Sequence, residues 1–425
     1  MTEFAALLEK ASYSPQDAAE KFGKTLKTIY RYINGETAVP KLIINVLHDH
    51  IKQGAITANL SSEGTFKYID LFAGIGGFRR AFDSIDGKCV FTSEWDKNCR
   101  ITYQENYYCD HQVVGDIREF TKDADALSNI PAHDFLVGGF PCQPFSLAGV
   151  SKKNSLGRSH GFRDETQGTL FFDIAQIIDH HKPSGFLLEN VKNLRSHDKG
   201  RTFDIIYRTL TEELGYTVDY RIIDGKSWVP QHRERVFIVG FKEDVGFRFK
   251  DFKAPDIEDG PKLGSILHRN GDSSDEVYTN EKGLAASKYT LTPRLWEYLQ
   301  QYREKHAAKG NGFGFSVFGP NDVTRTLSAR YHKDGSEILI HQNGDRPRRL
   351  TPRECARLMG FDAPGGSEFK IPVSDTQAYR QFGNSVVVPA AKAIATYLKP
   401  YLMEVMKRRK QSEQITMDFG TREAV

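Results

Sequence analysis

Short apolar segments that alternate with helix-like segments run through the middle of this chain. The apolar segments lie at residues 67–72, 89–93, 134–138, 185–188 and 235–240. Strands that are buried on both faces appear as continuous apolar runs, and helices connect such strands when they are parallel. The pattern therefore predicts an α/β fold with a mostly parallel sheet, whose ligands bind at the carboxyl ends of the strands.

The 425 residues are enough for about two or three domains. Residues 1–60 have the pattern of a separate helical unit, and residues 66–241 carry the alternation of strands and helices. Between 242 and 348 the periodicity fades, which predicts a smaller irregular domain. Helical patterns return in 349–405, so this segment is expected to rejoin the larger domain. The polar residues 406–425 predict a disordered tail.

The N-terminal residues have the spacing of a helix-turn-helix. Pro15 can open a short helix, Ala19 is small enough to lie where two helices cross, and Gly23 can take the positive φ of the turn. Ile29 supplies an apolar anchor on the second helix. The side chains expected to face outward toward DNA include Lys27 and Arg31. The alternative is a helical cap used for dimerisation or packing.

Charge and cysteine content limit the classes of function. Lysine and arginine total 58 against 55 for aspartate and glutamate, and a net charge of +3 is too small to indicate a nucleic-acid partner by itself. The five cysteines are an odd set without a Cys-x-x-Cys pair, which argues against a disulfide framework and a structural zinc site. We therefore expect free thiols in a reducing compartment and no metal.

The chain shows no signal that directs it to a membrane. No apolar run approaches the roughly 18 residues that a membrane span requires. The first residues also lack the basic and then apolar pattern of a signal peptide. We expect a cytoplasmic protein.

A glycine-rich loop follows the first apolar segment. Gly74, Gly76 and Gly77 allow the backbone to approach a ligand closely. However, Arg79 stands where the dinucleotide-binding pattern Gly-x-Gly-x-x-Gly needs its third glycine. A role in binding pyrophosphate is therefore disfavoured.

Acidic residues mark the ends of the next two strands. The second strand ends at Glu94 and Trp95, where a carboxylate can accept two ribose hydroxyls and an indole can stack on a purine. Asp116 marks a third strand end and offers an acceptor for an exocyclic amine. Each of these residues alone could equally be a cap or part of a turn. Together, in this order, they describe a nucleoside pocket without a phosphate cradle, as S-adenosylmethionine would require.

Cys142 is the candidate nucleophile. It lies just past a strand end, next to Pro141, in a loop whose prolines restrict the backbone. An isolated cysteine is more often an inert buried residue, but this one is presented at the ligand-binding edge of the sheet. Glu189 follows another strand at the same edge. Arg233 and Arg235 lie at the start of the last strand and can hold a phosphate or a ring carbonyl.

Four motifs, in the expected order, resemble those of the DNA (cytosine-5)-methyltransferase family. They are Gly-Phe-Pro-Cys-Gln-Pro-Phe-Ser at 139–146, Glu-Asn-Val at 189–191, Gln-x-Arg-x-Arg at 231–235 and Gly-Asn-Ser-Val-Val-Val-Pro at 383–389. The resemblance covers residues 67–400. The N-terminal unit and the segments 309–315 and 324–340 resemble more narrowly the bacterial group of EcoRII, Dcm and SsoII type.

This resemblance implies a Rossmann-like methyltransferase domain, formed by 66–241 and 349–405, and a target-recognition domain at 242–348. Pro141 would position the loop, Cys142 would attack the base, and Glu189, Arg233 and Arg235 would grip the cytosine. The cofactor would be S-adenosylmethionine. The residues expected at the cofactor are Phe72, Gly74, Gly76, Glu94, Trp95, Asp116, Ile117, Pro141, Leu170 and Asn384.

The implied reaction transfers a methyl group to carbon 5 of a cytosine that is flipped out of duplex DNA. Resemblance to the narrower group implies a target of CCWGG, CCNGG or CCGG type, in a restriction-modification or Dcm-like role. A cleft between the two lobes would hold the duplex. The residues expected to contact this DNA are Ser146, Arg325, Arg330 and Lys333.

Two further interpretations stay open. A tRNA cytosine-5 methyltransferase is the alternative enzyme, because a related class shares the catalytic core. The N-terminal unit is also a candidate autoregulator of transcription. We expect a monomer during catalysis and allow a dimer on operator DNA.

Overall fold

The computed structural model describes residues 2–10, 13–40, 43–44, 47, 64–141, 170–271, 277–310, 312, 314–343 and 346–420. The chain divides into two compact units, Met1–Gly64 and Thr65–Val425. Each unit has its own hydrophobic core. The division lies close to the boundary near residue 60 that the sequence predicts.

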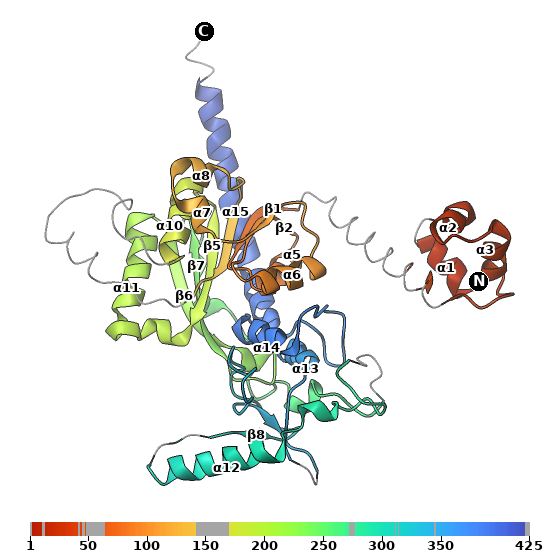
Figure 1. Cartoon of the computed structure of the whole chain (residues 1–425). Coiled ribbons are helices and arrows are strands. Elements are labelled where there is room, and N and C mark those ends of the chain that lie inside the picture. Colours follow the sequence, from red (N-terminus) through yellow and green to blue (C-terminus); the bar gives the residue numbers. More distant parts are fainter. Residues whose placement is uncertain are drawn as a thin grey trace. The chain divides into compact units, whose positions relative to one another are not determined.

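The N-terminal unit contains short helices, among them α1 (Glu3–Lys10), α2 (Pro15–Lys21) and α3 (Leu26–Ile33) (Figure 1). Ala18 and Ile29 are fully buried in its core. Between α2 and α3, Gly23 has a φ of 58°, a conformation that favours glycine. Thr25 caps α3, because its hydroxyl accepts a hydrogen bond from the amide of Thr28.

The second unit is built around a seven-stranded sheet. Its strands are β1 (Phe66–Leu71), β2 (Gly87–Ser93), β3 (Val113–Val114), β4 (Phe135–Gly139), β5 (Gly185–Val191), β6 (Thr217–Asp224) and β7 (Glu234–Phe241). Their order is β3-β2-β1-β4-β5-β7-β6. β7 runs antiparallel to β5 and β6, and the other neighbouring pairs are parallel. The mostly parallel α/β sheet that the sequence predicts is confirmed.

The apolar pattern does not reveal β6. This strand lies at the edge of the sheet, and most of its residues are only half-buried. Asp219, Tyr220 and Arg221 interrupt any apolar run in it. An edge strand has one neighbour and a partly solvated surface, so it needs no continuous hydrophobic sequence.

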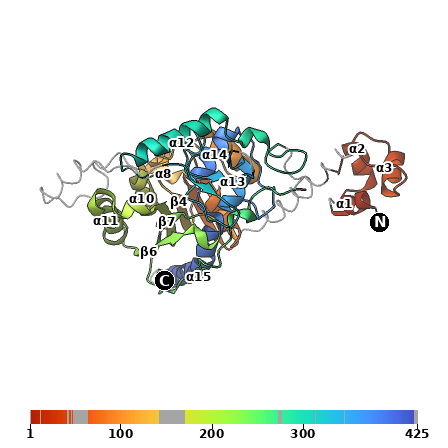
Figure 2. The same ribbon diagram turned by 90° about the horizontal axis from the view of Figure 1, so that it is seen from below.

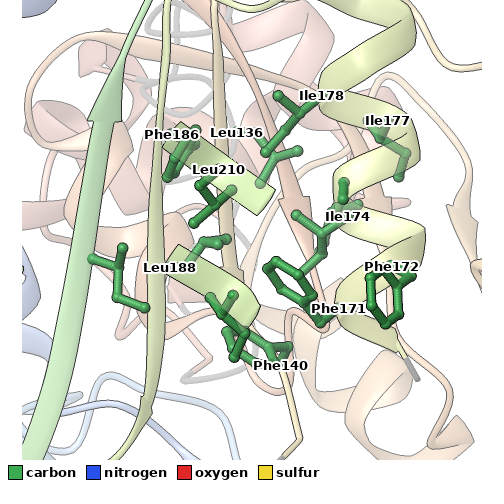
Figure 3. Packing of buried hydrophobic residues seen from close by; sticks show 14 of the residues in the cluster. Leu136, Phe140, Phe171, Phe172, Ile174, Ile177, Ile178, Phe186, Leu188 and Leu210 are labelled. Carbon is green, nitrogen blue, oxygen red and sulfur yellow. The ribbon is translucent and has the colours of Figure 1, made fainter. Parts of the chain in front are cut away.

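Helices cover both faces of the sheet. Leu136 of β4 packs in the same core as α10 (Leu170–His181), whereas Phe135 and Val137 pack in the core that contains α15 (Val388–Gly420). Figure 3 shows Leu136 on the face of the sheet that α10 covers. This alternation of side chains along β4 buries the central strand on both sides.

The other α-helices described in this unit are α5 (Gly77–Asp83), α6 (Lys97–Asn106), α7 (Arg118–Thr121), α8 (Ala124–Ser128), α11 (Arg201–Arg208), α12 (Pro293–Ala307), α13 (Pro352–Met359) and α14 (Asp375–Asn384) (Figures 1 and 2). Within the described part of the chain, no helix combines the length and the apolar character that crossing a bilayer requires.

Residues 242–348 contain few long helices or strands. They contain single-turn helices, α12, and most of a small sheet in the order β10-β9-β8. Its strands are β8 (Val317–Phe318), β9 (Leu339–Ile340) and β10 (Arg348–Arg349). Leu327 and Ile338 share a core with Leu358 of α13 and Phe382 of α14, so this region packs together with the returning segment. The 15-residue helix α12 was not expected from the sequence.

The C-terminal end corrects the prediction of a disordered tail. α15 continues to Gly420, so residues 406–420 are helical, while 421–425 lie outside the described residues. Arg408 pairs with Glu404, one turn earlier, at 2.8 Å. Ion pairs with this spacing and the good helix formers of the segment favour a helix even where the sequence is polar.

Candidate active site

The ends of β1, β2, β4 and β5 border a cavity of about 1440 Å³. A cavity for one small ligand usually measures roughly 300–1,000 Å³, so this one has room for a cofactor and a second group. The predicted site residues that line it are Phe72, Gly74, Glu94, Trp95, Pro141, Leu170, Glu189, Arg233, Arg235 and Asn384. The predicted cofactor residues that do not line it are Gly76, Asp116 and Ile117.

The loop after β1 is held in left-handed backbone conformations. Phe72, Gly74 and Gly76 have φ values of 55°, 55° and 83°. A Cβ at Gly76 would lie 2.2 Å from a ring carbon of Tyr107, whose hydroxyl donates a 2.9 Å hydrogen bond to the Gly76 carbonyl. Glycine at position 76 is therefore required by the packing of Tyr107, whereas Gly74 forms part of the cavity wall.

Glu94, directly after β2, is fixed by backbone donors. Its carboxylate accepts hydrogen bonds from the amides of Gly74 at 2.8 Å and Asp96 at 2.7 Å. Burial raises the pKa of Glu94, and these two amide hydrogen bonds oppose the shift. A carboxylate has about four acceptor positions, so two remain for a ligand such as a ribose.

Trp95 presents an open indole to the cavity, since its side chain is 67% exposed. The turn that carries it is fixed by Arg100, which donates to the carbonyls of Glu94 at 2.7 Å and Trp95 at 2.8 Å. An exposed ring of this kind is suited to stack on a purine. No motif in the sequence indicates this role of Arg100.

Asp116 and Ile117 follow β3. Ile117 is buried in the core and does not line the cavity. The Asp116 carboxylate accepts a bidentate pair of hydrogen bonds from Arg118, which lowers the pKa of Asp116. Arg118 lines the cavity and was also missed, although it directly follows the predicted Asp-Ile pair.

Glu189 and Arg235 form an ion pair from the neighbouring strands β5 and β7. Arg235 Nε lies 2.9 Å from Glu189 Oε1, and both side chains are largely buried. Burial raises the pKa of Glu189, while the charges of Arg235 and Arg233 oppose the shift. A Cβ at Gly139 would lie 3.2 Å from Glu189 Oε2, so glycine at this position leaves room for the carboxyl group.

Arg233 is fully buried in the wall of the cavity. It donates to the carbonyls of Leu327 at 2.8 Å, Gly383 at 2.9 Å and Ser385 at 2.7 Å. Burial lowers the pKa of Arg233 to about 9. Its Nε has no hydrogen-bond partner in the described part of the chain. Arg233 thus joins segments of the wall that lie far apart in the sequence.

Cys142 and Ser146 lie outside the described residues. The described chain reaches Pro141 and resumes at Leu170, and both of these residues line the cavity. The Asn190 side chain donates a 2.9 Å hydrogen bond to the Phe140 carbonyl. This bond anchors the backbone two residues before Cys142.

The other four cysteines, Cys89, Cys99, Cys109 and Cys355, are buried or half-buried. Burial raises the pKa of each thiol, to about 12 for Cys89. A thiolate is the reactive form of cysteine, so these four are poor nucleophiles near neutral pH. Among the described residues there is also no group of three or more His, Cys, Asp or Glu side chains that could hold a metal ion.

The predicted DNA contacts in the described chain are all exposed: Lys27 and Arg31 in α3 of the first unit, and Arg325, Arg330 and Lys333 in the second. The neighbours of Arg325 are tied to the segment before β7. The Thr324 amide donates to the Pro230 carbonyl at 2.9 Å, and the Thr326 hydroxyl donates to the His232 carbonyl at 2.7 Å. The backbone of Arg325 is therefore fixed relative to the cavity.

Comparison with known proteins identifies the family. The model of the C-5 cytosine-specific DNA methylases matches residues 66–400. A DNA-cytosine methyltransferase of Escherichia coli (strain K12) is 53% identical over 392 residues, which cover 82% of this chain and 80% of that protein. Type II methyltransferase M.SsoII of Shigella sonnei is 46% identical, over 87% of this chain and 89% of that protein.

Comparison with solved structures also finds methyltransferases. A crystal structure of S. pombe Dnmt2 methyltransferase matches with a TM-score of 0.56 at 18% identity, over 79% of this chain and 99% of that one. At this identity the match concerns the fold alone. The family model, in contrast, covers the whole region that builds the cavity. The chain belongs to the C-5 cytosine-specific DNA methylase family.

Proposed function

We propose that this protein transfers a methyl group from S-adenosylmethionine to carbon 5 of a cytosine in duplex DNA. One observation carries the proposal. Glu94 and Trp95, which suit a nucleoside, line the same cavity as Glu189 and Arg235, which suit a pyrimidine. Pro141, the residue before Cys142, lines this cavity as well.

The residues fit the chemistry of this cofactor. Trp95 offers a stacking surface to adenine, and Glu94 offers acceptors to the ribose hydroxyls. Asn384 lines the same cavity. Arg79 in place of a third glycine disfavours pyrophosphate, and this cofactor contains none. When bound, the cofactor supplies an electrophilic methyl group.

Cys142 supplies the nucleophile in this proposal. Its thiolate forms a bond to carbon 6 of cytosine, which interrupts the aromatic ring and makes carbon 5 nucleophilic toward the methyl group. Carbon 5 then loses its proton to a base or to water, and the bond between sulfur and carbon 6 breaks. The products are 5-methylcytosine, the demethylated cofactor and the free thiol.

Glu189 and Arg235 hold the base during this reaction. Since burial raises the pKa of Glu189, its carboxyl group is more easily protonated than an exposed one. A protonated Glu189 donates to ring nitrogen 3 and so stabilises the charge that develops when the thiolate attacks. In this proposal Arg235, which pairs with Glu189, contacts the ring carbonyl. Arg233 holds segments of the cavity wall together through its bonds to the Leu327 and Gly383 carbonyls, and its charge favours the ionised form of Glu189.

The substrate cytosine has to leave the duplex, because its carbon 5 and carbon 6 cannot be reached inside the stack. This step costs a few kcal/mol, which contacts to the rest of the DNA must offset. We assign these contacts to Ser146, Arg325, Arg330 and Lys333, with arginines reading guanine edges and lysines contacting phosphates. The proposed target is of CCWGG, CCNGG or CCGG type.

The test is bisulfite sequencing of DNA from a host without cytosine methylation that expresses the chain. The wild-type protein should methylate one of these targets, and Cys142→Ser should not. Cys109→Ser is the matched control and should act like the wild type. Absence of cytosine methylation would contradict the enzyme assignment, and a fully active Cys142→Ser variant would contradict the attack.

The same preparation tests the alternative substrate. Methyl transfer to duplex DNA and to tRNA is compared with a labelled cofactor. We expect incorporation into DNA, since segment 242–348 is long enough to read a duplex site. If the labelled methyl group were incorporated into tRNA alone, the protein would be a tRNA methyltransferase and this proposal would be wrong.

We also propose that α2 and α3 form a helix-turn-helix that binds operator DNA and regulates transcription of the chain's own gene. The capped start of α3, the glycine turn before it and the exposed Lys27 and Arg31 support this role. The double variant Lys27→Ala and Arg31→Ala should lose promoter binding in a gel-shift assay and keep methylation activity. Loss of both activities, or of neither, would contradict a separate operator-binding site.

A further inference from the structure

Arg118 contacts the two groups that the sequence predicts for binding a purine, Trp95 and Asp116. Its Nε and Nη2 bond to the two carboxylate oxygens of Asp116 at distances from 2.6 to 3.0 Å. Its guanidinium carbon lies 5.1 Å from the centroid of the Trp95 ring. Arg118 and Trp95 line the cavity, whereas Asp116 does not. The guanidinium therefore occupies both carboxylate oxygens of Asp116 while it lies against the Trp95 ring.

A purine does not fit between Arg118 and Trp95 in this arrangement. A ring stacked between two flat groups needs about 3.5 Å on each side, or about 7 Å in total. The observed distance of 5.1 Å is that of a direct cation–π contact. An adenine that stacks on this face of Trp95 and donates its amino group to Asp116 has to displace the Arg118 side chain.

We propose that Arg118 is a displaceable cover of the adenine subsite and that it sets the affinity for the cofactor. The proposal rests on the cofactor site described above. The ion pair with Asp116 and the contact with Trp95 exist only while the subsite is empty, so they compete with adenine. Contacts of these two kinds together change an equilibrium constant by roughly 3- to 30-fold.

The Arg118 side chain can be removed without disturbing the fold. This side chain is 57% exposed, and Arg118 is the first residue of the short helix α7. Asp116 keeps a 3.0 Å hydrogen bond from the backbone amide of residue 118, which does not depend on the side chain. In Arg118→Ala the carboxylate thus stays oriented while its other acceptor positions become free for a ligand.

Arg208 provides a matched control. It makes the same bidentate contact to a carboxylate, with Glu212, at 3.0 to 3.2 Å, and it is 64% exposed. Arg208 belongs to α11 and does not line the cavity. Arg208→Ala therefore removes the same charge and the same kind of ion pair from another part of the surface.

The experiment measures the binding of S-adenosylhomocysteine to the full chain by titration calorimetry. This ligand has no sulfonium, so removing a positive charge near it does not by itself raise its affinity. We expect Arg118→Ala to bind roughly 3- to 30-fold more tightly than the wild type, as the two lost contacts predict. Arg208→Ala should bind as the wild type does.

A second variant tests the cause. Asp116→Asn weakens the ion pair, so the gain from Arg118→Ala should shrink in that background. If Arg118→Ala binds the ligand equally or less tightly in the wild-type background, the proposal is overturned, and weaker binding would mean that Arg118 closes over bound adenine. If the wild type itself does not bind the ligand, the cofactor site is wrong and the proposal fails with it.

Discussion

Replacing Asp70 by asparagine should change how the stability of the second unit depends on pH. Asp70 lies near the end of β1 and is fully buried. One carboxylate oxygen accepts a 3.3 Å hydrogen bond from the Tyr103 hydroxyl, and the other has no hydrogen-bond partner in the described part of the chain. Burial raises the pKa of Asp70 to about 7, although the charge of Arg79 opposes the shift.

The size of the effect follows from this pKa. In an unfolded chain the pKa of aspartate is about 3.9. Between that value and about 7, the unfolded chain releases a proton that the folded chain keeps, so the free energy of unfolding falls as the pH rises. Three pKa units at about 1.36 kcal/mol each give a loss of about 4 kcal/mol at most.

Asparagine has the shape of the protonated carboxyl group and does not ionise. At about pH 4, Asp70→Asn and the wild type should therefore have similar stability, since each presents one acceptor and a donor at this site. The difference between them should grow as the pH rises and become constant above the folded-state pKa. At alkaline pH the variant should be the more stable protein.

Urea unfolding followed by tryptophan fluorescence measures these free energies across the pH range. Asp204→Asn, at an exposed position of α11, is the matched control and should not change the pH dependence. A stability difference between Asp70→Asn and the wild type that is the same at every pH would refute the reasoning. A variant that is less stable at alkaline pH would refute it as well.

Three other substitutions test packing around the cavity. Leu188→Ala, in the fully buried part of β5, should lower the free energy of unfolding by about 2–5 kcal/mol in urea titrations. Gln231→Ala removes the acceptor of the 2.8 Å hydrogen bond from the Leu327 amide and should cost about 1–3 kcal/mol in the same assay. Gly76→Ala should cost at least about 1–2 kcal/mol for its left-handed φ alone, and because its Cβ would meet Tyr107, calorimetry should show weaker binding of S-adenosylhomocysteine.

Local patterns were sufficient to predict the central strands. The apolar runs coincide with β1, β2, β4, β5 and β7, because a strand between two helical layers is apolar along its whole length. The pattern did not predict β6, because β6 is a half-exposed edge strand. It also did not predict the end of α15, because the residues there are polar although they favour a helix. It did not show the direction of β7 either, since direction depends on the strand's partners.

The sequence by itself also determined the candidate chemistry of Glu94, Trp95 and Glu189, because each lies at the end of an apolar run and the ends of such strands meet at one edge of a sheet. Only the tertiary structure decided which groups these residues contact. The carbonyls that Arg233 binds lie 94 to 152 residues further along the chain. The contact of Arg118 with Trp95 likewise joins different strand ends. Such contacts depend on the order of the strands and on the space left between packed side chains. The periodicity of apolar residues along the chain predicts neither the strand order nor this space.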